Sequence, residues 1–197
     1  MVSILFIGLV VTILLTPGPT NTLLASSGIQ IGIKRSLKLI PAEVLGYLIA
    51  ITTWGYLIEL ISHTLPWLPS VLKLISAGYI IFLAIKLWKK SLEQGNLDQP
   101  TITPKALFVA TLLNPKGLLF ASAIFPPETW NGMQQYSMHM GTFLALIIPI
   151  AFLWIAFGAA LISNQVKWLN QANLQRTASI ILVTFSLPLS YSAITSF

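Results

Sequence analysis

The sequence predicts an all-α integral membrane protein of six transmembrane helices, arranged as two inverted three-helix repeats, with the first and fourth helices broken at the midplane. Three observations support this prediction. Of the 197 residues, 55% are hydrophobic and only 8% are charged, whereas a soluble domain carries about 25% charged residues. The apolar residues form six runs of membrane-spanning length, and prolines interrupt two of these runs near mid-depth. With so few charged side chains, lipid must cover most of the surface.

The six apolar runs each reach the roughly 20 residues that a helix needs to cross a bilayer. They cover residues 3–28, 37–60, 68–88, 105–125, 140–162 and 177–196. The links between them are short and hold most of the charges and turn-forming residues, which leaves no segment for a soluble domain. We therefore expect one transmembrane domain over 1–197, with halves at about 1–95 and 100–197.

Basic residues concentrate in alternate links. The first, third and fifth links hold most of them: Lys34, Arg35, Lys38, Lys86, Lys89, Lys90, Lys105, Lys167 and Arg176. By the positive-inside rule these links are cytoplasmic, which places both termini outside the cytoplasm. The bases form short clusters instead of one continuous face, so nucleic acid is not an expected partner. No charge precedes Lys34, so the first run lacks the basic start of a signal peptide and should remain as a helix.

The first apolar run contains the sequence TPGPTN at residues 16–21. Pro17 and Pro19 lack an amide hydrogen and clash with the carbonyl four residues back, and Gly18 adds flexibility. Unpaired carbonyls are costly in hydrocarbon, so this break must face protein or a wet cavity. Asn21 is expected either to face the same cavity or to form a hydrogen bond with a neighbouring helix.

The fourth run contains a second break, in the sequence LNPKGLLF at residues 113–120. Asn114 can cap a new half-helix that begins at Pro115. Lys116 follows at membrane depth, where an ammonium costs at least about 2.5–3.5 kcal/mol and requires a partner or water. Two roles are consistent with this position: handling of a substrate or ion, and a purely structural cap.

The two breaks occupy corresponding positions in the two halves of the chain. Because each half has an odd number of helices, the second half enters the membrane from the opposite side, as in transporters with inverted repeats. Half-helices that begin after a proline direct amide hydrogens toward the centre, where a carboxylate can bind. The predicted substrate-binding residues are Pro17, Gly18, Pro19, Asn21, Asn114, Pro115 and Lys116. An ordinary proline kink is the simpler alternative for each break taken alone.

Glu43 is the candidate residue for coupling transport to an ion gradient. It lies just inside the second run, where it can titrate during transport or pair with Lys116. Alternatively, it can extend to the cytoplasmic rim and pair with Lys38. The chain has no cysteine and two histidines, and these lie far apart in the sequence, so we predict no catalytic residue, cofactor or metal site.

The paired sequences TPGPTN and LNPKGLLF resemble the signatures of the LysE/RhtB family of amino-acid exporters. The segment VLKLISAGYIIFLAIKLW, at residues 71–88, resembles the third helix of that family, and Pro126 falls where a proline follows its NPK segment. The likeness is good over roughly residues 10–127 and weaker beyond. It implies export of amino acids or related small metabolites across the inner, cytoplasmic membrane, driven by a proton or ion gradient.

Several positions depart from the family pattern, which tends to have glycine there: Ser36, Ala42, Ser76, Ala84, Ala178 and Pro188. The resemblance therefore does not identify the substrate. The expected partners are a small solute, an amino acid in the first instance, and the lipid bilayer, with a homodimer as a further possibility. The alternatives are a non-transport assembly or scaffold subunit, a transporter of metal ions or other solutes, and a membrane enzyme, for which the sequence has no clustered catalytic groups.

Overall fold

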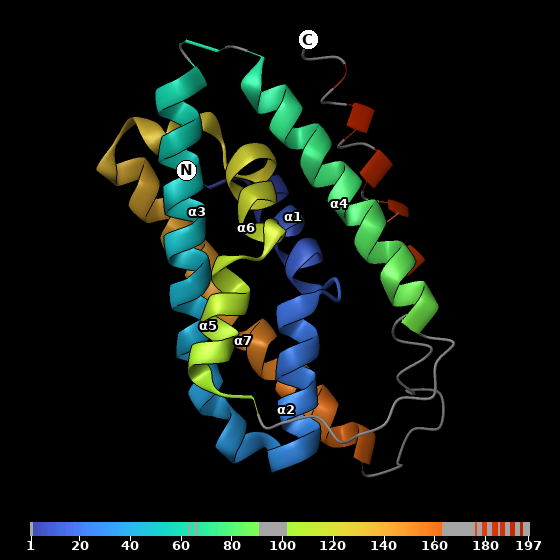
Figure 1. Ribbon diagram of the computed structural model, residues 1–197. Coiled ribbons are helices and arrows are strands. Elements are labelled where there is room, and N and C mark those ends of the chain that lie inside the picture. The colour runs from blue at the N-terminus through green and yellow to red at the C-terminus, as the bar shows by residue number, and fades with distance from the viewer. Residues whose placement is uncertain are drawn as a thin grey trace.

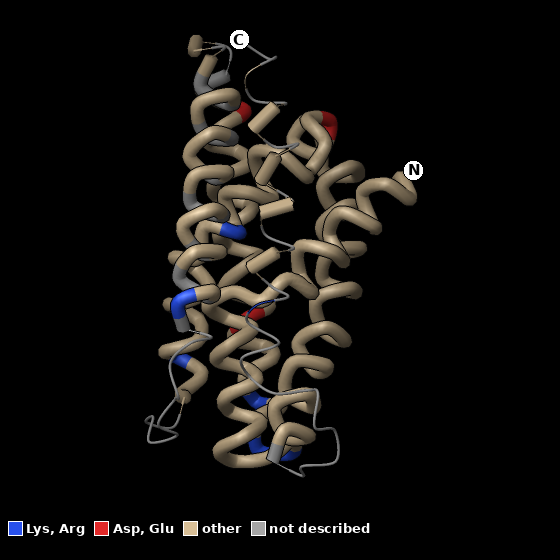
Figure 2. The backbone as a smooth tube through the Cα atoms, turned by 90° about the vertical axis from the view of Figure 1, so that its right-hand side faces the viewer, with Lys and Arg blue, Asp and Glu red and all other residues tan. Residues whose placement is uncertain are grey.

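The computed structural model describes residues 2–62, 64–65, 67–90 and 102–162, together with scattered positions between 176 and 194. Within these residues every secondary-structure element is helical, which confirms the all-α prediction for this part of the chain. The helices form an elongated bundle (Figure 1). Figure 2 shows that Lys and Arg gather mostly toward its lower end, and that the segments above them are almost uncharged.

The helices follow the predicted apolar runs in order. They are α1 (Ile4–Leu15), α2 (Pro19–Ser36), the 3₁₀ turn η1 (Leu37–Leu39), α3 (Ile40–Ser62), α4 (Leu68–Lys90), α5 (Pro104–Leu112), α6 (Pro115–Leu119), the π-helical turn η2 (Phe120–Ile124), the 3₁₀ turn η3 (Pro127–Asn131) and α7 (Met133–Ile162). Both predicted breaks are present, between α1 and α2 and between α5 and α6.

The described residues include two helical stretches long and apolar enough to cross a membrane, 19–61 and 133–161. A third candidate is the bent pair of α5 with the segment that begins at Pro115, whose axes differ by 43°. α1 is apolar but has only 12 residues. The sixth predicted span, 177–196, lies mostly outside the described residues. Six spans and an inverted repeat therefore remain predictions, whereas a helical bundle with helices of membrane-spanning length and composition is observed.

The first link is not the loop that the sequence predicted. The first run was expected to end at residue 28, but helical backbone continues past it because no proline or cap interrupts it there. α2 is then kinked at Gly32, whose dihedrals are non-helical, and ends at Ser36. The chain turns instead around Gly32, whose φ of 75° is readily adopted by glycine, and through η1. α3 then runs back beside α5, opposite in direction to α2 (Figure 1). The fifth helix also begins earlier than predicted, at Met133 instead of residue 140.

Glycines allow two sets of helices to pack with their backbones in close contact. A Cβ added at Gly28 of α2 would clash with the carbonyl of Ile155 in α7, and one added at Gly158 of α7 would clash with the carbonyl of Ala25 in α2. On the other side, a Cβ at Gly46 of α3 would press against Thr111 of α5. The helices α2 and α7 therefore form one tightly packed pair, and α3 packs closely against α5.

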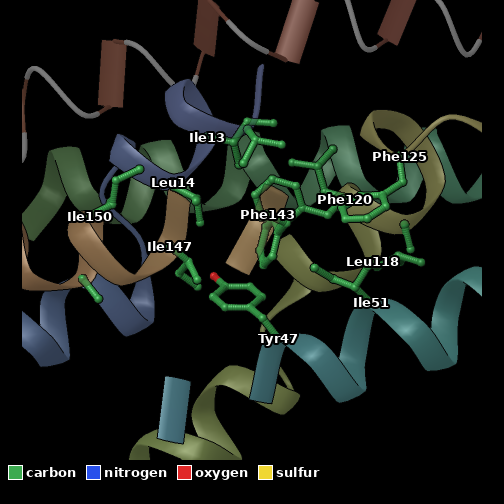
Figure 3. Close-up of a cluster of buried hydrophobic side chains, with 14 of the residues drawn as sticks. Ile13, Leu14, Tyr47, Ile51, Leu118, Phe120, Phe125, Phe143, Ile147 and Ile150 are labelled. Carbon is green, nitrogen blue, oxygen red and sulfur yellow. The ribbon is translucent and has the colours of Figure 1, made fainter. Parts of the chain in front are cut away.

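An aromatic cluster fills the space between these helix sets. The rings of Phe120 and Phe143 lie 4.9 Å apart between centroids, and Tyr47 lies 5.8 Å from Phe143 and 6.0 Å from Phe120. These edge contacts are the favourable arrangement for aromatic pairs. Figure 3 shows Tyr47 beside Phe143 and Ile147. The ring of Tyr47 is thus held in the core, where its hydroxyl group reaches the polar residues of the two breaks.

The close packing of α2 and α7 predicts an asymmetric effect of two glycine substitutions on one helix. Gly158→Ala places a Cβ against backbone that cannot move alone, so the helix pair must separate, which costs about 1–3 kcal/mol. Gly141→Ala, on the same helix, meets no atom within 4 Å and serves as the matched control. We expect a lower unfolding temperature in detergent for Gly158→Ala only. Equal unfolding temperatures for the two variants would contradict the close packing.

Candidate functional site

The two breaks, far apart in the sequence, meet in space through Lys116. The Nζ atom of Lys116 donates hydrogen bonds to the carbonyl oxygens of Ile13, at 2.9 Å, and Thr16, at 2.5 Å. These carbonyls belong to the last turn and the C-cap of α1. A cation is favourable here, because the C-terminal end of a helix carries partial negative charge. The second break thus supplies the cation that stabilises the first.

The other donors to the first break come from Asn21 and Trp154. The side-chain amide of Asn21 donates to Leu14, at 2.7 Å, and to Thr16, at 2.9 Å, and the indole of Trp154 donates to Leu14 at 3.3 Å. The amide of Thr16 also donates to Ile13. The carbonyls of Ile13, Leu14 and Thr16 therefore accept two hydrogen bonds each. No water is needed to satisfy these three groups within the membrane.

The second break is shaped by Asn114 and Pro115. Asn114 has extended backbone dihedrals at the N-cap of α6, and its Oδ1 accepts a hydrogen bond from the amide of Lys116 at 3.1 Å. Its Nδ2 donates to the hydroxyls of Tyr47, at 3.0 Å, and Thr20, at 3.3 Å. One side chain thus caps α6 and links it to α3 and to the first turn of α2.

The TPGPTN sequence gives Lys116 the room that it occupies. A Cβ added at Gly18 would lie 3.0 Å from Cε and 3.2 Å from Nζ of Lys116. Gly18 itself is extended, with φ of −156°, and provides no side chain to cap α2. Pro19 begins α2 at its first turn, where a missing amide hydrogen has no cost. The prolines therefore set the backbone path, and the glycine leaves space for the ammonium.

Glu43 lies in the same buried region and does not reach the rim of the bundle. Its side chain is 1% exposed, whereas Lys38, the predicted rim partner, is exposed. Of the two alternatives from the sequence, the structure favours the one in which Glu43 interacts with Lys116, through charge. The carboxyl also interacts with the side chain of Thr20. Its Oε2 atom is buried and accepts no hydrogen bond.

These side chains form what we call the midplane cluster: Thr20, Asn21, Glu43, Tyr47, Asn114 and Lys116. All six are buried, and Lys116, the most accessible, is 4% exposed. Sequence reasoning predicted four of them but missed Thr20 and Tyr47. Thr20 directly follows Pro19 in the motif, and Tyr47 lies one turn after Glu43 on α3, so proximity to predicted residues was the available signal. Trp154, which also donates to the first break, was not among the predicted site residues.

The midplane cluster has the chemistry of a binding site for a polar solute. It holds one buried carboxyl, one buried ammonium, two hydroxyls and two carboxamides, contributed by three segments of the chain. Among the described residues no group of three or more His, Asp or Glu could hold a metal ion. Charged groups inside the membrane are costly and mark substrate or ion pathways. The arrangement can bind charged groups through hydrogen bonds.

Helices broken at mid-depth, with buried charges where the breaks meet, are characteristic of membrane transporters. The sequence supports this class directly, because it matches the family model of the LysE type translocator over residues 11–193. The chain belongs to the LysE type translocator family, and it is a membrane-embedded protein of small-molecule transport. No curated protein and no solved structure matches it.

The paired donors on Leu14 predict a non-additive effect of two substitutions. Asn21→Leu and Trp154→Phe each remove one of the two donors to the Leu14 carbonyl. Trp154→Phe should cost about 0.5–1.5 kcal/mol. Asn21→Leu should cost about twice as much, because Asn21 also donates to the Thr16 carbonyl, which keeps its bond from Lys116. The double variant leaves the Leu14 carbonyl without either donor, and its cost should exceed the sum by about 1 kcal/mol or more. Unfolding free energies in detergent would measure this difference. Strict additivity would show that the two donors do not share this carbonyl.

Proposed function

We propose that this protein exports amino acids or related small metabolites from the cytoplasm by alternating access, coupled to a proton or ion gradient. The observation that carries the proposal is the contact between the breaks, in which Lys116 of the second binds the carbonyls of Ile13 and Thr16 in the first. This contact brings a buried cation next to the start of α2, whose first amides receive no side-chain cap, as solute binding near the midplane requires.

The bonds that join the two breaks are few and can be exchanged. Lys116 connects α6 to α1, and Asn114 connects α6 to Thr20 of α2 and Tyr47 of α3. The tightly packed pair of α2 and α7 lies on one side of these bonds, and α3 with α5 lies on the other. In the proposed cycle these helix sets move as units, and the prolines and Gly18 act as hinges. All residues of the midplane cluster are buried, so opening must precede binding and release.

A substrate carboxylate is proposed to bind between Lys116 and the first turn of α2. An ammonium group has three donors, of which Lys116 uses two on α1. The N-cap Gly18 makes no side-chain hydrogen bond to the amides of α2, and a helix N-terminus favours anions. These two donor sets are adjacent, because Gly18 lies against Lys116.

The proposed orientation in the inner membrane follows from the positions of the basic residues. The basic residues of the first and third links are placed on the cytoplasmic side by the positive-inside rule, with both termini on the other side. Their concentration toward one end of the bundle supports this orientation (Figure 2).

The orientation can be tested because the chain has no cysteine of its own. We expect a single cysteine at Asn131 to react with a membrane-impermeant maleimide in intact cells, and one at Leu37 to react only after permeabilisation. Both positions are exposed in the fold. The reverse labelling pattern would overturn the proposed orientation.

Export is tested with proteoliposomes or cells preloaded with a panel of labelled amino acids, under an imposed proton gradient. We expect wild-type protein to release at least one class of amino acid. Lys116→Ala should reduce the flux by about tenfold or more, because losing a charge-assisted hydrogen bond costs about 1.5–3 kcal/mol and about 1.4 kcal/mol corresponds to tenfold. Pro115→Ala should reduce flux similarly if the break is the hinge.

Two matched variants control this experiment. Lys105→Ala removes an exposed lysine in the same helical span, and Pro149→Ala removes a proline from inside the unbroken helix α7. Both should transport at the wild-type rate when flux is normalised to protein in the membrane. If wild-type protein moves no amino acid, the substrate is another solute, a metal ion, or none, as for a scaffold subunit. If the measured flux is the same with and without the imposed proton gradient, the proposed coupling to protons is wrong.

A further inference from the structure

One carboxyl oxygen of the midplane cluster has no hydrogen-bond partner. Oε2 of Glu43 is buried and accepts no hydrogen bond, although the carbonyls of Ile13, Leu14 and Thr16 each accept two. Buried hydroxyls without a hydrogen-bond partner, those of Ser122 and Thr129, also occur among the described residues. A buried carboxylate oxygen without a donor is costly. This unpaired oxygen indicates a position that a hydrogen-bond donor of the ligand occupies.

The nearby cation does not fill this position. Lys116 interacts with Glu43 through charge, but its ammonium donates to the carbonyls of Ile13 and Thr16. The hydroxyls on the other side are also engaged with neighbours: Tyr47 accepts from Asn114, and Thr20 and Tyr47 lie 3.5 Å apart. None of these donors lies within hydrogen-bond distance of the open oxygen.

The group that suits this oxygen is a positively charged hydrogen-bond donor. An anion is disfavoured at this oxygen, because an anionic group offers no donor to a carboxyl oxygen. A solute with an ammonium and a carboxylate one carbon apart can bind Glu43 with the first group and Lys116 with the second. It adds no net charge to the membrane interior, so the pairing of Glu43 and Lys116 stays balanced.

We infer, on the basis of the proposed export of amino acids, that Glu43 binds the ammonium group of the substrate and selects solutes that carry one. Lys116 and the first turn of α2 then hold the carboxylate. A 2-hydroxy acid has the same carbon skeleton and carboxylate but cannot compensate Glu43 with a positive charge. When bound, it leaves the carboxylate of Glu43 buried without a counter-ion. A site that hydrogen-bonds a polar group of its substrate strongly rejects an analogue that lacks this group.

The test compares each exported amino acid with the 2-hydroxy acid of the same skeleton, both labelled, in proteoliposomes. Wild-type protein should transport the amino acid at least about tenfold faster. Glu43→Gln keeps the shape but loses the charge. It should raise KM for the amino acid about tenfold or more while leaving the hydroxy acid nearly unaffected, which brings the ratio of rates toward one. Glu59→Gln, the same substitution on the same helix, is the control and should keep the wild-type ratio.

Each outcome separates this inference from the function on which it rests. Transport of amino acid and hydroxy acid at equal rates by wild-type protein would overturn the role of Glu43 and leave export intact. A Glu43→Gln variant that slows both solutes equally, or that loses only its response to the proton gradient, would also overturn it, in favour of a structural or proton-carrying carboxyl. No export of any amino acid by wild-type protein would remove the proposed function and the inference together.

If the Glu43→Gln protein does not accumulate in the membrane, Glu43→Asp is the variant that tests the inference. It retains the carboxylate on a shorter side chain. We expect the preference for the amino acid to persist, with a higher KM for the amino acid because the carboxylate lies farther from the ammonium. An unchanged KM for the amino acid would show that the position of this carboxylate does not matter for substrate binding.

Discussion

Backbone carbonyls at membrane depth must find donors within the protein, and the end of α1 is where this requirement is met. The carbonyls of Ile13, Leu14 and Thr16 receive their hydrogen bonds from Lys116, Asn21, Trp154 and the backbone of Thr16. The three side-chain donors come from α6, α2 and α7, so satisfying one helix end fixes the mutual positions of three other helices. The break in α1 is thus an organising centre of the bundle, and the remaining packing is built around it.

The same constraint explains why charged residues are tolerated in the core. Lys116 is stabilised by the partial negative charge of a helix end as well as by Glu43, so it does not depend on a single counter-ion. Glu43 is less well satisfied, because its Oε2 has no donor. The cluster is therefore uneven: the ammonium of Lys116 makes two hydrogen bonds to backbone carbonyls, whereas Oε2 of Glu43 makes none. The two ends of the site therefore differ in their capacity to accept a hydrogen bond from a ligand. This difference would be absent from a purely structural ion pair.

Local features of the sequence predicted the breaks but not their meeting. Pro17, Pro19 and Pro115 have local consequences, so their positions could be read directly. That Lys116 would donate to α1 depends on how distant segments pack, which one sequence does not encode in any short pattern. Thr20 and Tyr47 are neutral side chains common in any helix, so they carried no signal of their own. The end of α2 was misplaced because the stop comes from a glycine dihedral after residue 28, and not from a proline or cap.

The contact between Gly18 and Lys116 also bears on how the family can vary. A side chain at position 18 would occupy the space of the Lys116 methylene and ammonium groups, so neither position can change freely while the other keeps its residue. The two signature sequences lie far apart along the chain, but they are sterically coupled through Gly18 and Lys116. A side chain at position 18 would displace the end of Lys116 by a few tenths of an ångström, and with it the hydrogen bonds that this residue donates to the end of α1.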